Sequence, residues 1–255
     1  MSVVLALVLV AGHGVGCRQQ VAGDRQVLIV HAASSLTEAF QELKREFERS
    51  HPLTEVSLVF SGSQVLRIQI EQGAAADILA TANQQHTEIL VEAGLVKNPL
   101  VFAHNELVLI VPHDNPAGIE SFEDLPKAQR LVVGTDQVPV GQYTRQMLLK
   151  AADRLGMQFT RQVQSRVVSL ESNARLVRAK VELGEADAAL VYRTDAAISD
   201  RVRSIPIPAE INVQARYFIG ELAASEGQQV VRDWIAFALS PAGQAILIRH
   251  GFVEG

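Results

Sequence analysis

The sequence predicts an α/β protein with two lobes, each a mixed, mostly parallel sheet flanked by helices. Three observations lead to this prediction. The expected strands are nearly continuous apolar runs, as in strands that are covered on both faces. The segments between them carry apolar residues at helical spacing. Strand and helix then alternate in two separate series along 255 residues, of which 48% are hydrophobic and 5% aromatic. A chain of this length and composition can bury a sizeable core.

The formal net charge of −5 and the lack of any run of basic residues limit the classes of partner. A general polyanion binder needs a basic surface, and a single-strand binder needs aromatic stacking platforms. We therefore expect no nucleic-acid partner. An anion that binds this chain must be held at a local site.

Residues 1–25 are predicted to be a leader that lies outside the fold. The apolar run 3–12 is too short to span a bilayer but has the length of a signal-peptide core, although no basic residue precedes it. Cys17, the only cysteine, follows Gly-Val-Gly, which resembles a bacterial lipoprotein cleavage box. We expect export to the periplasm or to the outer face of the cytoplasmic membrane, with a lipid anchor at Cys17. The alternative is an incidental thiol in a discarded leader.

The first series after the leader reads as three strand–helix pairs. Near-continuous apolar runs indicate the strands, the helical spacing of apolar residues indicates the helices, and Gly73 stands where a helix C-cap is expected. Such a βαβαβα order implies parallel strands joined by right-handed crossovers. The expected strands are 26–33, 55–60 and 76–83, and the expected helices are 36–47, 64–73 and 84–95.

A second series begins with a strand at 106–112. It continues with strands at 130–135 and 186–192, the last ending at Tyr192, and with helices at 118–126, 141–156 and 173–183. Two closing helices are separated at Ser240-Pro241, where serine caps and proline begins the second helix. We place one lobe at 26–104 plus 217–255 and the other at 105–216. The crossing segments near 105–107 and 215–217 are the expected hinges.

Two adjacent serines stand where the first strand turns into the first helix. Ser35 and Glu38 fit the capping box S-x-x-E, which would satisfy the free amides of the helix start. The same amides and the positive end of the helix dipole could instead receive an anion. The local pattern is compatible with both interpretations of Ser35.

Other strand ends and helix starts in the sequence resemble this one, and the residues that they place there are uncharged. We call these positions corners. In an open parallel sheet, ligands bind outside the carboxyl ends of the strands, where helices begin. There this chain offers hydroxyls and backbone amides and, in the serine corners, no Lys or Arg, which suits a small oxyanion better than a phosphate-transfer site. Each corner also has a plain structural explanation, such as a flexible turn or a packed ring. The corners are Ser34-Ser35, Ser61-Gly62-Ser63, Val140-Gly141, Asn173-Ala174 and Tyr192.

Five stretches in this order resemble the bacterial molybdate-binding proteins: AASSLTEAF, FSGSQVLRIQIEQGAAADILATAN, VGTDQVPVGQY, GEADAALVYRTDA and SPAGQAILIRHGF. The resemblance runs from about Leu28 to Phe252. It implies a type II periplasmic-binding-protein fold that captures molybdate, and tungstate with it, for import through the membrane permease of an ABC transporter. It implies no catalysis and no cofactor, and we expect a monomer.

The resemblance also implies the ligand set. Ser35, Ser63 and Tyr192 would supply hydroxyls, and Val140 and Ala174 would supply backbone amides. They would bind molybdenum as molybdate, through its oxygens. Ala174 stands where the family usually has valine, which leaves the backbone donor intact. Ser34 is expected to be a neighbour of the site and not a ligand.

Two other functions were weighed. A binding protein for another tetrahedral oxyanion, such as sulfate, would need the same donors. A serine hydrolase would need a serine activated by a histidine and an acid. The sequence has no G-x-S-x-G elbow, and its histidines show no pairing with the serines, so a hydrolase is disfavoured.

Overall fold

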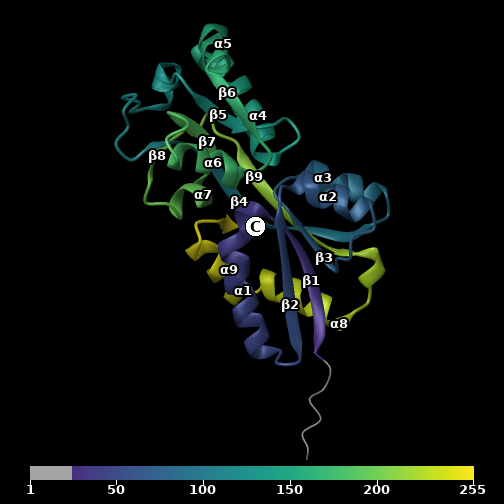
Figure 1. The fold of residues 1–255 in the computed structure, drawn as a ribbon. Helices are drawn as coiled ribbons and strands as arrows, with labels where there is room; N and C mark the ends of the chain where they lie inside the picture. Colours follow the sequence, from purple (N-terminus) through teal and green to yellow (C-terminus); the bar gives the residue numbers. More distant parts are fainter. Residues whose placement is uncertain (1–24) are drawn as a thin grey trace, which may run out of the picture.

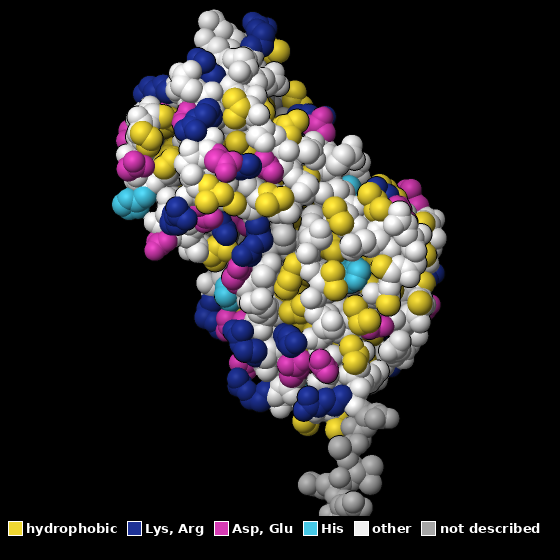
Figure 2. All heavy atoms as spheres, in the orientation of Figure 1, with side chains coloured by type: hydrophobic (Ala, Val, Ile, Leu, Met, Phe, Trp, Pro, Cys, Tyr) yellow, Lys and Arg dark blue, Asp and Glu magenta, His cyan; other side chains and the backbone are white. Residues whose placement is uncertain are grey.

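The computed structural model describes residues 25–255, which form two α/β halves joined by two long strands (Figure 1). The predicted leader and its Cys17 lie outside the described residues. Within the part of the chain described, no helix is long and apolar enough to cross a membrane. On the face seen in Figure 2, acidic and basic side chains are interspersed over both halves.

The first half is built on β1 (Gln26–Ala33), which pairs in parallel with β2 (Thr54–Ser61) and β3 (Ile78–Thr81). Its helices are α1 (Thr37–Ser50), α2 (Ser63–Glu71) and α3 (Gln84–Glu92). Gly73 follows α2 at φ 84°, a left-handed conformation that glycine adopts without a Cβ penalty. The predicted strand–helix series of this half is confirmed.

The second half is centred on β5 (Leu131–Gly134), which pairs in parallel with β6 (Val167–Glu171) and β7 (Ala188–Tyr192). The helices α4 (Pro139–Leu155) and α6 (Ala174–Glu182) follow β5 and β6. The predicted end of a strand at Tyr192 is confirmed. The remaining elements are the 3-10 helix η2 (Phe122–Lys127), α5 (Met157–Ser165), α7 (Arg193–Ala197) and β8 (Val202–Pro206).

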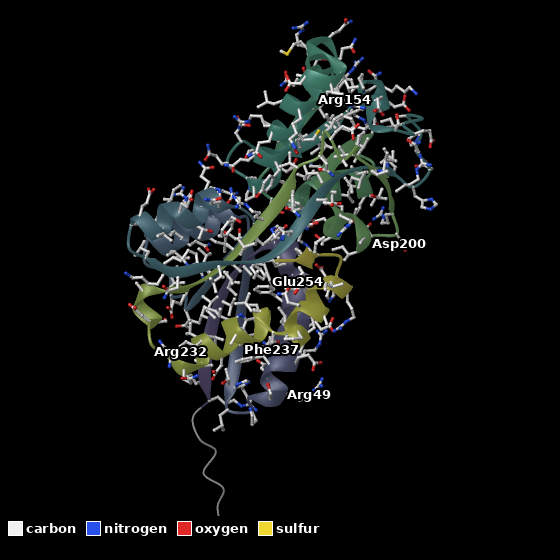
Figure 3. The ribbon with its side chains drawn as sticks, turned by 180° about the vertical axis from the view of Figure 1, so that it is seen from behind. Arg49, Arg154, Asp200, Arg232, Phe237 and Glu254 are labelled. Carbon is white, nitrogen blue, oxygen red and sulfur yellow. The ribbon has the colours of Figure 1, made fainter. Side chains whose placement is uncertain are left out.

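Two strands run from one half into the other. β4 (Val96–Pro112) pairs with β9 (Gln214–Leu222) up to Glu106, and from Leu107 onward it pairs with β7 and β8. Their course side by side is visible from both directions (Figures 1 and 3). β4 is therefore ten residues longer at its start than the predicted strand 106–112, because its first part is held by antiparallel pairing to a segment more than 100 residues away.

The C-terminal segment returns to the first half. Helices α8 (Gln229–Leu239) and α9 (Pro241–Arg249) are followed by the short strand β10 (Val253–Glu254), which pairs with β4. Fully buried Trp234 of α8 contacts Phe40 and Phe47 of α1 edge to face, with ring centroids 6.0 and 5.2 Å apart. The predicted cap is confirmed, since Ser240 Oγ accepts the N–H of Gly243 at 3.2 Å.

The predicted capping box at Ser35 is wrong. The chain enters α1 through a 3-10 turn, η1 (Ser34–Leu36), and no side chain caps either helix start. Instead, Thr37 Oγ1 donates to the Ser34 carbonyl at 2.7 Å. The Ser35 hydroxyl lies 2.9 Å from that of Tyr217, a residue of β9 that is distant in sequence.

Each half carries an aspartate at the start of a parallel strand that ties neighbouring backbone together. Asp77 precedes β3 and accepts the N–H of Ile29 in β1 at 2.7 Å. Asp187 precedes β7 and accepts the N–H groups of Gln129 and Arg130, both at 2.9 Å, and the Arg130 guanidinium. Burial alone would raise the pKa of Asp187, but these hydrogen bonds outweigh it and hold the pKa below its usual range.

Asp187→Asn should lower the free energy of unfolding by about 2–3 kcal/mol at pH 7, because the buried acceptor loses its charge. A depressed pKa stabilises the fold above the unfolded-state value of about 3.9 and ceases to do so as the pH falls through the folded-state value. Urea denaturation of wild type and variant at several pH values should therefore give a difference that shrinks below about pH 4. Asp136→Asn, at an exposed ion pair with Arg145, is the control and should change little. An equal loss at all pH values would contradict this account.

Candidate functional site

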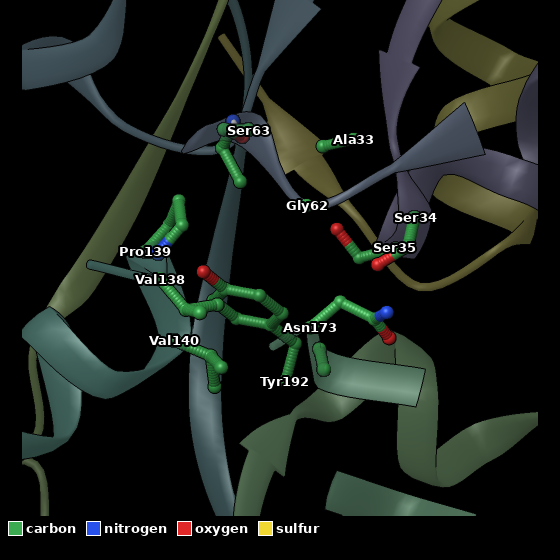
Figure 4. Close-up of a pocket in the computed structure, with 12 residues that line it drawn as sticks. Ala33, Ser34, Ser35, Gly62, Ser63, Val138, Pro139, Val140, Asn173 and Tyr192 are labelled. Carbon is green, nitrogen blue, oxygen red and sulfur yellow. Dashed lines mark hydrogen bonds between the residues drawn. The ribbon is translucent and has the colours of Figure 1, made fainter. Parts of the chain in front are cut away.

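A small cavity lies between the two halves, where the ends of their strands face each other (Figure 4). The centre of a water-sized sphere can move through ≈ 10 Å³ of it. The cavity is therefore small, which favours a ligand of a few atoms over a sugar, nucleotide or peptide. The lining carries no charged side chain: Ala33, Ser34, Ser35, Gly62, Ser63, Ala82, Val138, Pro139, Val140, Asn173, Ala174 and Tyr192.

The structure brings all five residues of the predicted ligand set together at this cavity. Ser35 and Ser63 come from the first half, and Val140, Ala174 and Tyr192 come from the second. It also places Ser34, which we expected to be only a neighbour, in the lining. Gly62, Asn173 and the start of α4 complete the wall. Ala33, Ala82, Val138 and Pro139 also line the cavity and were not among the predicted ligands, because any apolar residue near a strand end could fill such a place.

Helix starts converge on the cavity from both halves. Ser63 is the first residue of α2, Val140 the second of α4 and Ala174 the first of α6. The N–H groups in the first turn of a helix have no intrahelical acceptor, and the helix dipole is positive at this end. Asn173 caps α6 by accepting the N–H of Leu176 at 3.0 Å, which leaves the amide of Ala174 free of the cap. The cavity is thus surrounded by partial positive charge without any cation.

Ser63 has its acceptor function already in use. Its Oγ accepts the backbone N–H of Ala82 at 3.1 Å, and its side chain is 1% exposed. The hydroxyl hydrogen remains available for an acceptor in the cavity. Ser63 is therefore presented as a hydrogen-bond donor.

Tyr192 brings a buried hydroxyl with no partner among the described residues. The residue is 1% exposed, and its hydroxyl points into the space bounded by Val138, Ser63 and Ser35 (Figure 4). The ring packs edge to face against Tyr143 and Tyr217. Burial raises the pKa of Tyr192 well above its usual value, so the group stays a neutral donor. A buried hydroxyl without a hydrogen-bond partner lowers the stability of the fold unless a ligand or a water forms a hydrogen bond with it.

Close backbone approaches set the walls of the site. A Cβ on Gly62 would stand 2.6 Å from the Ser172 carbonyl of the other half, and a Cβ on Gly134 would stand 2.9 Å from the amide of Gly141. Real Cβ atoms do not come this near to a backbone atom. Glycine at these two places lets the halves meet and lets α4 start directly over the end of β5.

Polar contacts join the halves around the cavity. Gln64 Nε2 donates to the Ser172 carbonyl at 2.7 Å, and Asn83 Nδ2 donates to Gln142 Oε1 at 2.7 Å. An ion pair between Arg175 of α6 and Glu38 of α1, also at 2.7 Å, joins the two halves as well. These contacts describe a closed arrangement of the two halves.

One titratable group is buried near the cavity without lining it. Asp195 of α7 is 1% exposed, and neither carboxylate oxygen has a hydrogen-bond partner among the described residues. Burial raises its pKa to about 7, although Arg178 and Arg175 oppose this effect. The uncharged form of Asp195 therefore adds no negative charge beside the tyrosines at mildly acidic pH.

The arrangement offers hydrogen-bond donors and no catalytic pair. No serine of the cavity is hydrogen-bonded to a histidine in the described part of the chain, so a Ser–His nucleophile is not assembled there. Hydroxyls and amides at converging helix starts can instead hold a small anion by directed hydrogen bonds. The fold and this enclosed neutral site define a solute-binding protein of two halves.

The chain belongs to the bacterial extracellular solute-binding protein family, whose model matches residues 28–253. This is a family of binding proteins, in agreement with the expectation that the chain is not an enzyme. It is 33% identical over 230 residues to the molybdate-binding protein ModA of Mycobacterium tuberculosis, covering 89% of this chain and 84% of that protein. A Bacillus subtilis protein, named provisionally as the ABC transporter substrate-binding lipoprotein YvgL, is 26% identical over 97% of this chain and 94% of its own length.

Solved structures share the fold. The periplasmic molybdate-binding protein of Azotobacter vinelandii superposes with a TM-score of 0.76 at 18% identity, covering 89% of this chain and 99% of that one. The sulfate-binding protein SubI of Mycobacterium tuberculosis gives 0.80 at 15% identity, covering 90% and 87%. At these identities the likeness concerns the fold alone. It confirms the predicted two-lobed periplasmic-binding-protein architecture.

Proposed function

We propose that this protein captures molybdate, and tungstate with it, in the cavity between its halves and delivers the ion to the membrane permease of an ABC transporter. The observation that carries the proposal is the buried, unpartnered Tyr192 hydroxyl in a cavity of neutral donors. The molybdate-binding relative at 33% identity supports the choice of ion. We propose Ser35, Ser63 and Tyr192 as hydroxyl ligands and Val140 and Ala174 as amide ligands.

A fully deprotonated tetrahedral dianion matches this lining. Its oxygens accept hydrogen bonds and donate none, and the lining can supply donors from several directions. Enclosure in a small cavity strengthens each hydrogen bond and the helix-dipole attraction, because little water screens them. Phosphate keeps a proton near neutral pH and would need an acceptor. Sulfate has the charge and shape of molybdate and differs in size, so it is the comparison ligand in the first test.

Ser63→Ala and Tyr192→Phe should each weaken molybdate binding by about 1.5–3 kcal/mol, the typical contribution of a hydrogen bond to a charged group. This corresponds to roughly 10- to 100-fold in Kd. Isothermal titration of residues 25–255 with molybdate, tungstate, sulfate and phosphate measures it. Ser199→Ala, on the surface segment after α7, is the control and should bind as wild type does. Absence of molybdate binding, or a preference for sulfate, would reject the proposed ion.

We also propose that the segments 26–104 plus 217–255 and 105–216 move as two lobes. The change of β4 from pairing with β9 to pairing with β7 and β8 between Glu106 and Leu107 supports hinges near 105–107 and 215–217. Neither lobe alone supplies enough donors for a dianion, so the ion should favour the closed state. Small-angle scattering should show a smaller radius of gyration with molybdate than without it. An unchanged radius alongside tight binding would contradict lobe motion.

Export and anchoring complete the proposal. The family is one of extracellular proteins, and the Bacillus subtilis relative named as a lipoprotein supports acylation at Cys17. In bacterial cells that express the full chain, wild type should partition with membranes and into a detergent phase. Cys17→Ser should leave the protein in the aqueous fraction. The same distribution for both chains would rule out an anchor at Cys17.

A further inference from the structure

A buried hydrogen-bond chain leads to Ser35 from behind the cavity wall. Tyr217 of β9 is fully buried, and its hydroxyl lies 2.9 Å from Ser35 Oγ. Tyr217 does not line the cavity. Next to it, Asn105 of β4 is also fully buried, and its Nδ2 lies 3.5 Å from the Tyr217 hydroxyl. The two long strands that join the halves thus meet the site through these two side chains.

The orientation of the Asn105 amide follows from a backbone donor. Its Oδ1 accepts the N–H of Glu106 at 2.9 Å, and a backbone N–H cannot act as an acceptor. The Nδ2 group must therefore be the one that faces Thr194 Oγ1, at 2.8 Å, and the Tyr217 hydroxyl. Both Nδ2 hydrogens have a partner in this orientation. Asn105 consequently presents a donor, and not an acceptor, to Tyr217.

By distance alone, either of the next two hydroxyls could donate to the other, and the Asn105 donor favours one direction. Tyr217 Oη receives a hydrogen from Asn105 at 3.5 Å, which leaves its own hydrogen free to donate to Ser35 Oγ, 2.9 Å away. Ser35 Oγ then accepts from Tyr217, and its hydrogen is left for the cavity. We propose that Tyr217 is a positioning residue, which Asn105 orients and which holds Ser35 as a donor to the bound oxyanion. This inference rests on the proposed function.

The direction matters because a serine hydroxyl can rotate. A Ser35 that donated to Tyr217 would turn a lone pair toward the anion, and a lone pair repels an oxyanion. Burial raises the pKa of Tyr217 well above its usual value, so the phenol keeps the proton that the chain requires. Hydrogen bonds arranged in one direction also polarise one another. Ser63 is prepared independently, through the amide of Ala82.

The test is a set of double-mutant cycles with molybdate as the titrated ligand. Tyr217→Phe should raise the Kd about tenfold, the order expected when one hydrogen bond of a charged acceptor loses its orientation. In a Ser35→Ala background the same change should have almost no further effect, because there is no hydroxyl left to position. In a Ser63→Ala background it should keep its full effect. A loss caused only by disturbed packing would appear equally in both backgrounds.

Tyr143→Phe is the matched control. Tyr143 is also buried and also packs against Tyr192, and its hydroxyl oxygen accepts the backbone N–H of Arg216, 3.1 Å away. In a double-mutant cycle with Ser35→Ala, Tyr143→Phe should show no coupling free energy for molybdate binding. Asn105→Ala provides a second variant, in which the Tyr217 ring is unchanged. Asn105→Ala should weaken molybdate binding in the wild-type background and should have no further effect in the Ser35→Ala background.

The outcomes separate this inference from the proposed function. Suppose that the wild type binds molybdate and that Ser35→Ala and Ser63→Ala both weaken binding. If Tyr217→Phe then has no effect, or if its effect adds fully to that of Ser35→Ala, Tyr217 does not have the proposed role. The proposed function would still stand. Wild type that fails to bind molybdate overturns both. If Tyr217→Phe does not fold, judged by its circular dichroism, the Asn105→Ala cycle decides.

Discussion

The pairing of β4 with β9 is the constraint on which the rest of the structure depends. β4 leaves its partner β9 after Glu106 and continues in the second sheet with β7 and β8. One continuous strand therefore belongs to both sheets, and it holds them with the carboxyl ends of their parallel strands facing each other. Helices begin at those ends, and so the starts of α2, α4 and α6 meet at one cavity. Without this shared strand the corners of the two halves would have no common ligand.

The chemistry of the cavity follows from what surrounds it. Charged side chains are absent from its lining, so hydroxyls and amides in fixed directions supply the attraction for an anion. Burial keeps the tyrosines in their neutral, donating form. Fixed donors inside a low-dielectric site distinguish ions by shape and by protons, whereas a cationic clamp would attract any anion. Burial raises the pKa of the buried acid Asp195 to about 7, so a large part of it is uncharged near neutral pH.

The contacts that close the two halves over the cavity are also made largely by uncharged groups. Gly62 permits a carbonyl of the other half to approach, and the amide side chains of Gln64 and Asn83 cross the seam. Neutral amide contacts of this kind are made and broken at a modest cost in free energy. The ion pair of Glu38 and Arg175 is partly exposed, and solvent weakens such pairs. An ion held by donors from both halves would add to these contacts.

Local patterns determined much of the fold. Apolar runs and helical spacing located β1, α3 and α6, and the Ser240-Pro241 signal located the start of α9, because each depends on neighbours within one turn or strand. Local patterns also placed five residues at strand ends and helix starts, and the family resemblance implied that these are the ligands: Ser35, Ser63, Val140, Ala174 and Tyr192.

What the sequence alone did not determine depends on residues far apart in the chain. β9 and the first part of β4 are strands because they pair with each other across more than 100 residues, and neither has a strong local signal. Ser35 has the local pattern of a capping box, but its hydroxyl is hydrogen-bonded to that of Tyr217, 182 residues away. The cavity volume, the burial of Tyr192 and the direction of the Asn105 amide are likewise set by tertiary packing. Local sequence patterns show which hydrogen-bond donors the chain has, but the directions of these donors depend on the tertiary structure.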